Sequence, residues 1–390
     1  MPNDITYNIL LKLNVKSLLR FKCVCKSWCS LIEDPQFIKH HYDMSKMDVN
    51  RHKFFLTGGE WENKDDYFYS VDTPLQHDSA ASLIESPIPG INHLSSVSFV
   101  SSSNNGIILM VFPYDLIILW NPTIRELRRI PNSISKMKKL ERKRFPAIYG
   151  LGYVSSIDEY KIVRVRAKDN SNGHFEIDLF SMRDNSWKLI GKFPPFNFFH
   201  EGDIVSIDGI VYMIVMADLS KSMNESTILS FCLEKEQFEE VLFPDRILRF
   251  QNPILHVLEE NLCLTRMHNL ASCDFEVWHM KKDGSMSTTW SKILTIPSMY
   301  YGHCLRRVKL MKINEYIIFL RYKGDFEVYN TNGERSKIIE VPEIDSLFYY
   351  INWIVPYVES LFSPKQSQIR NFKKMDASIP EKKRNVILKE

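Results

Sequence analysis

The stretch that decides the fold is Ile118-Leu119-Trp120-Asn121-Pro122, which leads through a short polar turn to Leu127-Arg128-Arg129-Ile130-Pro131. The first half is a short run of aliphatic and aromatic residues, and after the turn the second half carries Leu127 and Ile130 and ends in Pro131, which is typical of paired antiparallel strands. From about residue 52 the chain continues in this way, with almost no helical periodicity. The pattern therefore predicts a domain built from many short antiparallel strands.

The same strand–turn–strand pattern recurs at regular intervals along the chain. Its central aromatic residues are Tyr69, Trp120, Phe180, Phe231, Trp278 and Tyr329, so the intervals between them are 51, 60, 51, 47 and 51 residues. A period of about 50 residues is what one four-stranded propeller blade requires. The spacing predicts six blades, with seven as the alternative. We expect the late strand at 353–358 to pair with the first blade and close the ring, because closure removes exposed sheet edges.

The opening of the chain follows a different pattern. Apolar residues at helical spacing predict three short helices, and they are Ile5, Ile9, Leu10 and Leu13, then Val15, Leu18 and Leu19, then Val24, Trp28, Leu31 and Ile32. Asn14 is a candidate N-cap for the second helix, and Asp34-Pro35 begins a fourth. A unit this small cannot bury all its apolar side chains, so we expect another polypeptide to cover some of them.

These patterns define the predicted organisation. The fold class is α+β, with a three-helix module at residues 1–45 and an all-β, propeller-like domain at residues 52–362. Residues 363–390 are polar and Lys-rich without periodicity, which predicts a disordered tail.

Bulk composition narrows the function classes. The chain has 50 Lys and Arg residues against 47 Asp and Glu residues, a balance that disfavours general nucleic-acid binding. We expect no membrane span and no signal peptide, since no apolar run is long enough and the N-terminus lacks the required profile. Seven cysteines with scattered spacing predict free thiols. The expected location is the cytoplasm, or the nucleus if Lys382-Lys383-Arg384 acts as a signal.

Residues capable of chemistry are present but do not form a recognisable site. Cys23, Cys25 and Cys29 are followed by His40 and His41, yet this spacing matches no common structural zinc pattern. Five further histidines are scattered without recurring spacing: His174, His200, His256, His268 and His303. The chain has no nucleophile elbow, phosphate-binding loop or H-E-x-x-H motif. We predict no catalytic residue, no metal and no cofactor.

Several stretches carry a family resemblance. The run from Ile9 to Trp28 (ILLKLNVKSLLRFKCVCKSW) closely resembles the F-box of plant F-box proteins. The runs Leu119–Glu126 (LWNPTIRE), Tyr149–Tyr153 (YGLGY) and Glu276–Met280 (EVWHM) resemble the F-box-associated, Kelch-like interaction domain common in plants. Within that group, Tyr357-Val358-Glu359-Ser360-Leu361 resembles the pollen S-locus F-box proteins of self-incompatible plants.

The resemblance implies a non-catalytic subunit of a ubiquitin ligase. In this family the F-box binds a Skp-type adaptor, which joins a cullin scaffold and a RING subunit, and the second domain holds the protein target. The implied adaptor contacts are Pro2, Ile9, Leu10, Leu13, Leu18, Val24 and Trp28. The target would be read by loops of the propeller, for which the candidates are residues 60–66, 132–147, 194–203 and 266–274. For the S-locus subgroup the target would be a pistil ribonuclease.

Three departures from the family pattern keep alternatives open. Met1-Pro2 stands where the family usually has Leu-Pro, Asn14 stands where it usually has Pro, and Gly58-Gly59 is the only glycine doublet although Kelch blades normally repeat one. The first alternative is a propeller scaffold with a degenerate F-box that joins no ligase. The second is a propeller enzyme such as a glycan oxidase or a lactone hydrolase.

Overall fold

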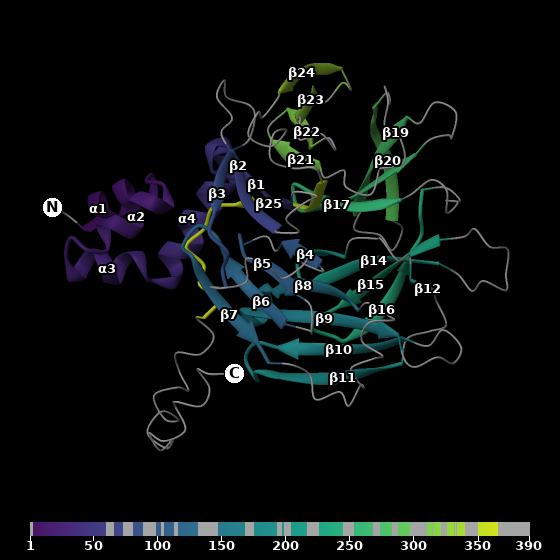
Figure 1. The fold of residues 1–390 in the computed structure, drawn as a ribbon, viewed down its shortest axis with the longest axis horizontal. Coiled ribbons are helices and arrows are strands. Elements are labelled where there is room, and N and C mark those ends of the chain that lie inside the picture. The colour runs from purple at the N-terminus through teal and green to yellow at the C-terminus, as the bar shows by residue number, and fades with distance from the viewer. Residues whose placement is uncertain are drawn as a thin grey trace.

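The computed structural model of the 390-residue chain describes residues 3–59, 66–72, 81–88, 99–102, 105–112, 116–131, 147–167, 175–192, 197–198, 204–216, 226–244, 253–267, 274–282, 288–296, 310–313, 315–320, 326–330, 332, 334–339 and 350–365. A group of helices lies at one side of a ring of β-sheets (Figure 1). None of the helices among these residues is both long enough and apolar enough to span a membrane.

Four α-helices come first. They are α1 (Asn3–Leu11), α2 (Val15–Phe21), α3 (Lys26–Ile32) and α4 (Pro35–Met47), and the short 3-10 helix η1 (Val49–Arg51) leads to the first strand. Both predicted caps are confirmed. The Asn14 side chain accepts a hydrogen bond from the Ser17 backbone N–H at 2.8 Å, and Asp34 accepts from the two backbone N–H groups that follow Pro35. Val24 lies in the turn before α3, not within that helix as predicted.

The helices share one apolar core with the segment that follows the last described strand. Its buried members are Leu10, Leu11, Val15, Leu18, Ile32, Phe37, Ile38 and Leu361. Leu361 lies more than 300 residues after the helices in sequence, so the helical module (residues 3–47) is anchored on the β-domain by the same burial that holds its helices together.

The strands form six antiparallel sheets within the described residues, which we number as blades 1 to 6. Blade 1 contains β25 (Tyr350–Val358), β1 (His52–Gly59), β2 (Asp66–Asp72) and β3 (Ala81–Ile84), in that order. Blade 2 contains β4 (Phe99–Ser102), β5 (Ile108–Phe112), β6 (Leu116–Asn121) and β7 (Glu126–Ile130). Blade 3 contains β8 (Ile148–Val154), β9 (Glu159–Ala167), β10 (Phe175–Ser181) and β11 (Ser186–Lys192).

The remaining blades follow the same order. In blade 4, β12 (Asn197–Phe198) and β13 (Val205–Ile207) both pair with β14 (Ile210–Met216), and β15 (Ser226–Cys232) and β16 (Gln237–Val241) follow. Blade 5 contains β17 (Ile254–Leu258), β18 (Asn261–Met267), β19 (Phe275–Lys282) and β20 (Thr288–Ile296). Blade 6 contains β21 (Leu310–Ile313), β22 (Tyr316–Leu320), β23 (Phe326–Asn330) and β24 (Arg335–Ile339). The fold is a six-bladed propeller, as predicted.

The six repeating aromatic residues occupy the same place in every blade. Each lies on the third strand, counted outward from the axis, and they are Tyr69, Trp120, Phe180, Phe231, Trp278 and Tyr329. Five of the six are buried, and Trp278 is half-buried. A large aromatic side chain on the third strand fills the space between neighbouring blades, which explains why the sequence repeats it once per blade.

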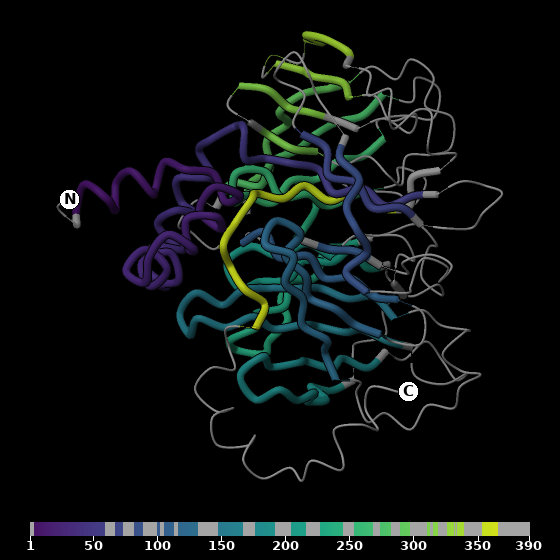
Figure 2. The backbone as a smooth tube through the Cα atoms, turned by 60° about the vertical axis from the view of Figure 1, so that its left-hand side comes forward, coloured from purple at the N-terminus to yellow at the C-terminus, as the bar shows by residue number. Residues whose placement is uncertain are grey.

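The ring closes through the two ends of the β-domain. Strand β25 pairs antiparallel with β1, with His52 opposite Val358 and Thr57 opposite Trp353. In Figure 2 the yellow C-terminal strand accordingly runs beside the start of the β-domain. The predicted closure is confirmed, and it places the last strand at the innermost position of blade 1.

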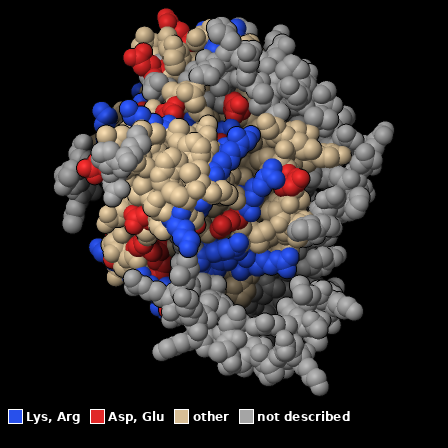
Figure 3. Space-filling view, turned by 90° about the vertical axis from the view of Figure 1, so that its left-hand side faces the viewer, with Lys and Arg blue, Asp and Glu red and all other residues tan. Residues whose placement is uncertain are grey.

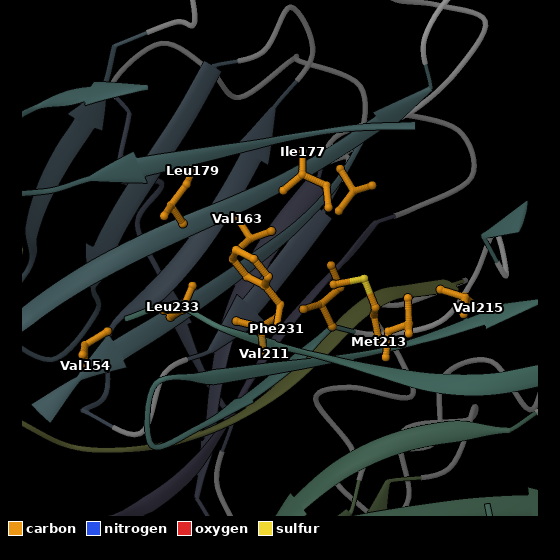
Figure 4. Close-up of a cluster of buried hydrophobic side chains, with 12 residues drawn as sticks. Val154, Val163, Ile177, Leu179, Val211, Met213, Val215, Phe231 and Leu233 are labelled. Atoms are coloured by element: carbon orange, nitrogen blue, oxygen red, sulfur yellow. The ribbon is translucent and has the colours of Figure 1, made fainter. Parts of the chain in front are cut away.

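Neighbouring blades pack through dry apolar clusters. Figure 4 shows the cluster between blades 3 and 4, where Val163 and Leu179 of one blade meet Val211, Met213 and Phe231 of the other. The clusters fix the blades relative to one another, since close-packed interiors resist deformation.

Strand direction gives the ring two distinct faces. Because directions alternate within a blade, the turns from first to second strand and from third to fourth strand all lie on one face, and several are short: 155–158, 182–185, 208–209 and 259–260. Strand β1 begins and β25 ends on this face, so the helical module lies over it; we call it the helical face. The connections between second and third strands, and between blades, join strand ends on the opposite face.

Candidate functional site

The helical module presents apolar side chains to solvent. Ile5 and Ile9 lie one helical turn apart on the same side of α1 and are 47 % and 45 % exposed, and Val24, in the turn before α3, is 60 % exposed. Leu13 and Trp28 are half-buried, and the Trp28 ring lies 5.4 Å from the Phe21 ring. Exposed aliphatic residues gathered on so small a module are typical of a protein-binding surface.

The predicted contact residues divide into three groups. Ile9, Leu13, Val24 and Trp28 reach the surface of the module. Leu10 and Leu18 are fully buried in the module's own core, where they stabilise the helices, and their role as adaptor contacts stays a prediction. Pro2 lies outside the described residues. Ile5, which the prediction did not include, is also exposed one helical turn from Ile9.

Basic side chains surround this apolar surface. Between Asp4 and Glu33 the chain has five Lys and Arg residues and no acidic residue. Of these, Lys12, Lys16, Arg20 and Lys26 are exposed, and Lys22 pairs with Glu33 at 3.2 Å. Figure 3 shows Lys and Arg side chains gathered on the side of the molecule where the helices lie. The simplest interpretation of this basic face is that it keeps the module soluble.

The cysteines of the module do not form a metal site in the structure. Cys23 and Cys25 are exposed and Cys29 is half-buried, and all three are free thiols. The Ser27 hydroxyl lies 3.1 Å from the Cys25 sulfur, and this contact lowers the pKa of the Cys25 thiol. Among the described residues no three His, Cys, Asp or Glu side chains come together as metal ligands would.

A buried polar network joins the helical module to the propeller at Arg51. The Arg51 guanidinium donates to the Ser45 hydroxyl at 2.7 Å, to the Lys12 carbonyl at 3.1 Å and to the Asp48 carboxylate at 3.2 Å. The Arg51 carbonyl accepts from the backbone N–H of Glu359 at 2.9 Å. One residue thus joins the segment after α1, helix α4 and the segment after β25, and a charge this buried keeps such geometry only when its partners are in place.

His41 lies in the same network and is fully buried. Its Nε2 lies 2.8 Å from the Leu13 carbonyl oxygen and 3.0 Å from the Arg51 guanidinium. Burial, helped by the nearby Arg51 charge, lowers the pKa of His41 to about 4, although the hydrogen bond to Leu13 acts in the opposite sense. The imidazole is therefore neutral at neutral pH.

The segment after β25 crosses under the module and is held by Asn121. The Asn121 amide nitrogen lies within 3.1 Å of the Ser360 carbonyl and hydroxyl oxygens and of the Phe362 carbonyl oxygen. Phe362 then packs edge-on against Tyr42 of α4. Ser363 and Pro364 continue these contacts, since Ser363 donates to Glu126 and Pro364 is buried. The predicted tail therefore begins later than residue 363, and residues 366–390 lie outside the described part of the chain.

The predicted substrate loops fall mostly outside the described residues, but the strands that flank them are described. Loops 60–66 and 266–274 join second to third strands, and loops 132–147 and 194–203 join successive blades. All four therefore start and end on the face opposite the helical module. Of the scattered histidines, His256 is buried in β17, and His174, His200, His268 and His303 lie outside the described residues.

Comparison with known proteins agrees with this geometry. Residues 1–40 match the F-box domain model, and residues 62–364 match the model of the F-box associated beta propeller domain. The chain therefore belongs to the family of F-box proteins that carry an F-box associated β-propeller.

The chain is similar to curated F-box proteins of Arabidopsis thaliana. The F-box protein CPR1 is 29 % identical over 316 residues, which covers 76 % of this chain and 73 % of that protein. The F-box/kelch-repeat protein At3g23880 is 26 % identical over 347 residues, which covers 86 % of this chain and 89 % of that protein. A six-bladed fungal lectin from Aleuria aurantia is 9 % identical over 74 % of this chain and 96 % of that chain, with a TM-score of 0.36, and nothing further rests on that likeness. The S-locus subgroup stays a prediction.

Proposed function

We propose that this chain is the substrate-recognition subunit of a Skp–cullin–F-box ubiquitin ligase. Its helical module binds a Skp-family adaptor, and through it the cullin and RING subunits, and the propeller face opposite that module binds the protein to be ubiquitinated. The observation that carries the proposal is the exposure of Ile9, on α1, and of Val24, in the turn before α3, within the residues that match the F-box model.

The mechanism under this proposal is proximity. The chain supplies no acid, base or nucleophile; it holds lysines of the target near the ubiquitin thioester of the charged enzyme and so raises their effective concentration. Such positioning requires that the two binding surfaces keep a fixed relation. The Arg51 network and the ion pair between Lys46 of α4 and Glu260 of blade 5, at 2.9 Å, support that requirement.

One departure from the family pattern is accommodated by the structure. Asn14 replaces the usual proline, and its side chain caps α2 through the Ser17 backbone N–H. The helix that carries Leu18 therefore still begins where an F-box helix should. This favours the ligase subunit over a scaffold with a degenerate F-box.

The test is binding of a purified Skp-family adaptor to the full chain and to surface variants. Ile9→Asp, Leu13→Asp, Val24→Asp and Trp28→Ala should each weaken binding by about 30-fold, equivalent to about 2 kcal/mol, because each removes a desolvated contact. Leu189→Asp is the matched control, because Leu189 is 56 % exposed on blade 3, and its affinity should stay within about twofold of the parent. Absence of binding by the parent chain, or equal binding by all variants, would overturn the proposal.

The identity of the target needs a different experiment. Affinity capture from the expressing tissue, with proteasome activity blocked, should recover the target with both the parent chain and Val24→Asp, because that variant leaves the propeller intact. The adaptor should be recovered with the parent alone. A target recovered only when the adaptor is present would contradict the assignment of target binding to the propeller.

A further inference from the structure

A large cavity lies where the axis of the propeller meets the helical module. Its volume is about 580 Å³, and its walls come from the innermost strands β4, β13, β17, β21 and β25 and from Tyr42, Lys46 and Met47 of α4. The strands β4, β17, β21 and β25 are labelled toward the middle of the ring in Figure 1. The helical module borders this cavity on one side, and we call the cavity the axial chamber. It lies apart from the exposed helical surface and from the opposite face discussed above.

The walls of the axial chamber are firmly held. Leu255 belongs to the apolar core between blades 4 and 5, Met311 and Ile354 to the core between blades 6 and 1, and Val100 and Val355 to the core between blades 1 and 2. All five side chains are buried. A chamber whose walls are anchored in separate cores cannot collapse when empty, which is the property of a pre-formed ligand site.

The chamber also offers many hydrogen-bonding groups. Within the described sheets each innermost strand is hydrogen-bonded on one side only, so its other edge turns backbone N–H and C=O groups toward the axis. Ser101 and Ser206 add polar side chains to the lining. Such groups need partners, which a molecule with hydroxyl or carbonyl groups supplies as well as water does.

Charges around the chamber are already compensated. Lys46 pairs with Glu260 at 2.9 Å, and Lys312 pairs with Glu259 at 2.6 Å. A charged ligand would have to displace one of these pairs or remain without a counter-charge, whereas a neutral ligand would leave both intact. His52, also in the lining, donates to the Lys46 carbonyl at 2.8 Å and adds no charge, because burial lowers its pKa.

We propose that the axial chamber binds a neutral amphipathic small molecule, one with an apolar ring skeleton and several hydroxyl or carbonyl groups. The volume lies within the range of about 300 to 1,000 Å³ that is usual for sites of drug-sized ligands. Because α4 and five blades share the lining, the ligand contacts the helical module and the propeller at once, and its binding stabilises their junction. The proposal does not depend on the ligase function.

The test uses two fluorescent probes that share one ring system and differ in charge. N-phenyl-1-naphthylamine is neutral, and 8-anilinonaphthalene-1-sulfonate is its anionic counterpart. Titrated into the folded full-length chain, the neutral probe should bind saturably with one site per chain and raise the melting temperature. The sulfonate should bind this site at least about tenfold more weakly. No saturable binding of the neutral probe, or equal affinity for both probes, would overturn the proposal without any variant.

Two substitutions then locate the site. Ser101→Phe and Val257→Phe fill the chamber from blades 2 and 5, which lie opposite each other in the ring. Each substitution should weaken binding of the neutral probe at least about tenfold. Ser186→Phe, on the exposed outer strand of blade 3, is the control and should leave binding unchanged. A probe bound instead to the exposed Ile5, Ile9 and Val24 would be indifferent to both filling substitutions, and that outcome would also contradict the proposal.

Discussion

Protonation of one residue, His41, makes the free energy of unfolding depend on pH. Its pKa in the folded chain is about 4, below the usual value of about 6.5, so the unfolded chain binds the proton more tightly. Stability from this group is therefore complete above about pH 6.5 and is lost as pH falls toward 4. At pH 5 the loss should amount to about 2 kcal/mol.

The measurement is urea unfolding at pH 7 and pH 5. The parent chain should lose about 2 kcal/mol more between the two values than His41→Gln, which cannot take up the proton. An identical loss in both proteins would show that His41 does not carry the acid sensitivity.

Arg51 provides a second test at the residue scale. Arg51→Ala leaves the Lys12 carbonyl, the Ser45 hydroxyl and the Asp48 carboxylate without their donor, and it should lower the free energy of unfolding by about 3 kcal/mol. Arg20→Ala is the control, because Arg20 is exposed and forms no ion pair among the described residues; its change should stay below about 0.5 kcal/mol. Comparable losses in the two variants would contradict the assigned role of Arg51.

Sequence reasoning succeeds with residues whose role is local and fails with those whose partners are distant. Asn14 and Asp34 cap helices through atoms two or three positions away, and both caps were predictable. The burial of Leu10 was not predictable, because both sides of α1 carry aliphatic residues. Which side is buried depends on packing against Leu361. The role of Arg51 gave no sequence signal, since its partners extend from Lys12 to Glu359.

At the scale of elements, the turn between β17 and β18 is strained. Glu259 and Glu260 have φ of +48° and +62°, a left-handed backbone conformation that residues other than Gly, Asn and Asp rarely adopt. The equivalent turn of blade 4 uses Asp208 and Gly209, with φ of +44° and +73°. Replacing Glu259-Glu260 by Asn-Gly should therefore raise the free energy of unfolding by about 1 kcal/mol, and losing the two exposed ion pairs should offset little of it.

Blade 4 supplies the matched control for this prediction. Gly209→Glu places a side chain in the left-handed position where the nearest neighbouring atom would be 3.5 Å from its Cβ, so the cost is backbone strain and not a clash. It should lower the free energy of unfolding by about 1 kcal/mol. Thermal unfolding that moves in the same direction for both changes would refute the strain argument.

The strand β6 ends in a residue that holds the last segment of the chain. Asn121→Ala should destabilise the protein by about 2 kcal/mol, because the Ser360 and Phe362 carbonyl oxygens lose their buried donor. Asn330 follows the aromatic residue of blade 6 just as Asn121 follows that of blade 2, but its bonds stay within its own turn. In urea unfolding Asn330→Ala should cost less than half as much; equal costs would contradict the distant role of Asn121.

Elements repeated once per blade were predictable because one residue type marks each copy. The aromatic residues placed the third strand of all six blades, and a period of about 50 residues fixed the blade count. The pairing of β12 and β13 with one strand was not predicted, because strands this short lack an alternating pattern.

At the scale of the whole molecule, ring closure should decide whether the propeller folds. A chain that ends at residue 349 lacks β25 and exposes the edge of β1, so it should aggregate or fail to unfold cooperatively. A chain that ends at residue 365 keeps β25, Leu361 and Phe362 and should match the full chain in melting temperature. Size-exclusion chromatography and circular dichroism distinguish the two, and a monomeric, cooperative chain ending at 349 would contradict the closure argument.

The helical module and the proposed target-binding surface lie on opposite faces because of chain topology alone. The chain enters the ring at His52 and leaves it at Val358, both on the helical face, so the other face is left to the connections between blades. Length and period predicted the propeller, but which loops face away from the helices depended on strand direction. A target bound there would contact loop residues whose identity no repeat constrains.

Hydrogen exchange of the full chain, with and without a Skp-family adaptor, tests the central claim most directly. The account predicts that adaptor binding slows exchange in α1 and in residues 22–28, where Ile9 and Val24 are exposed, and leaves the strand ends on the opposite face unchanged. Unchanged exchange throughout residues 3–34, or protection confined to the propeller, would contradict the claim that these helices complete their burial on another polypeptide.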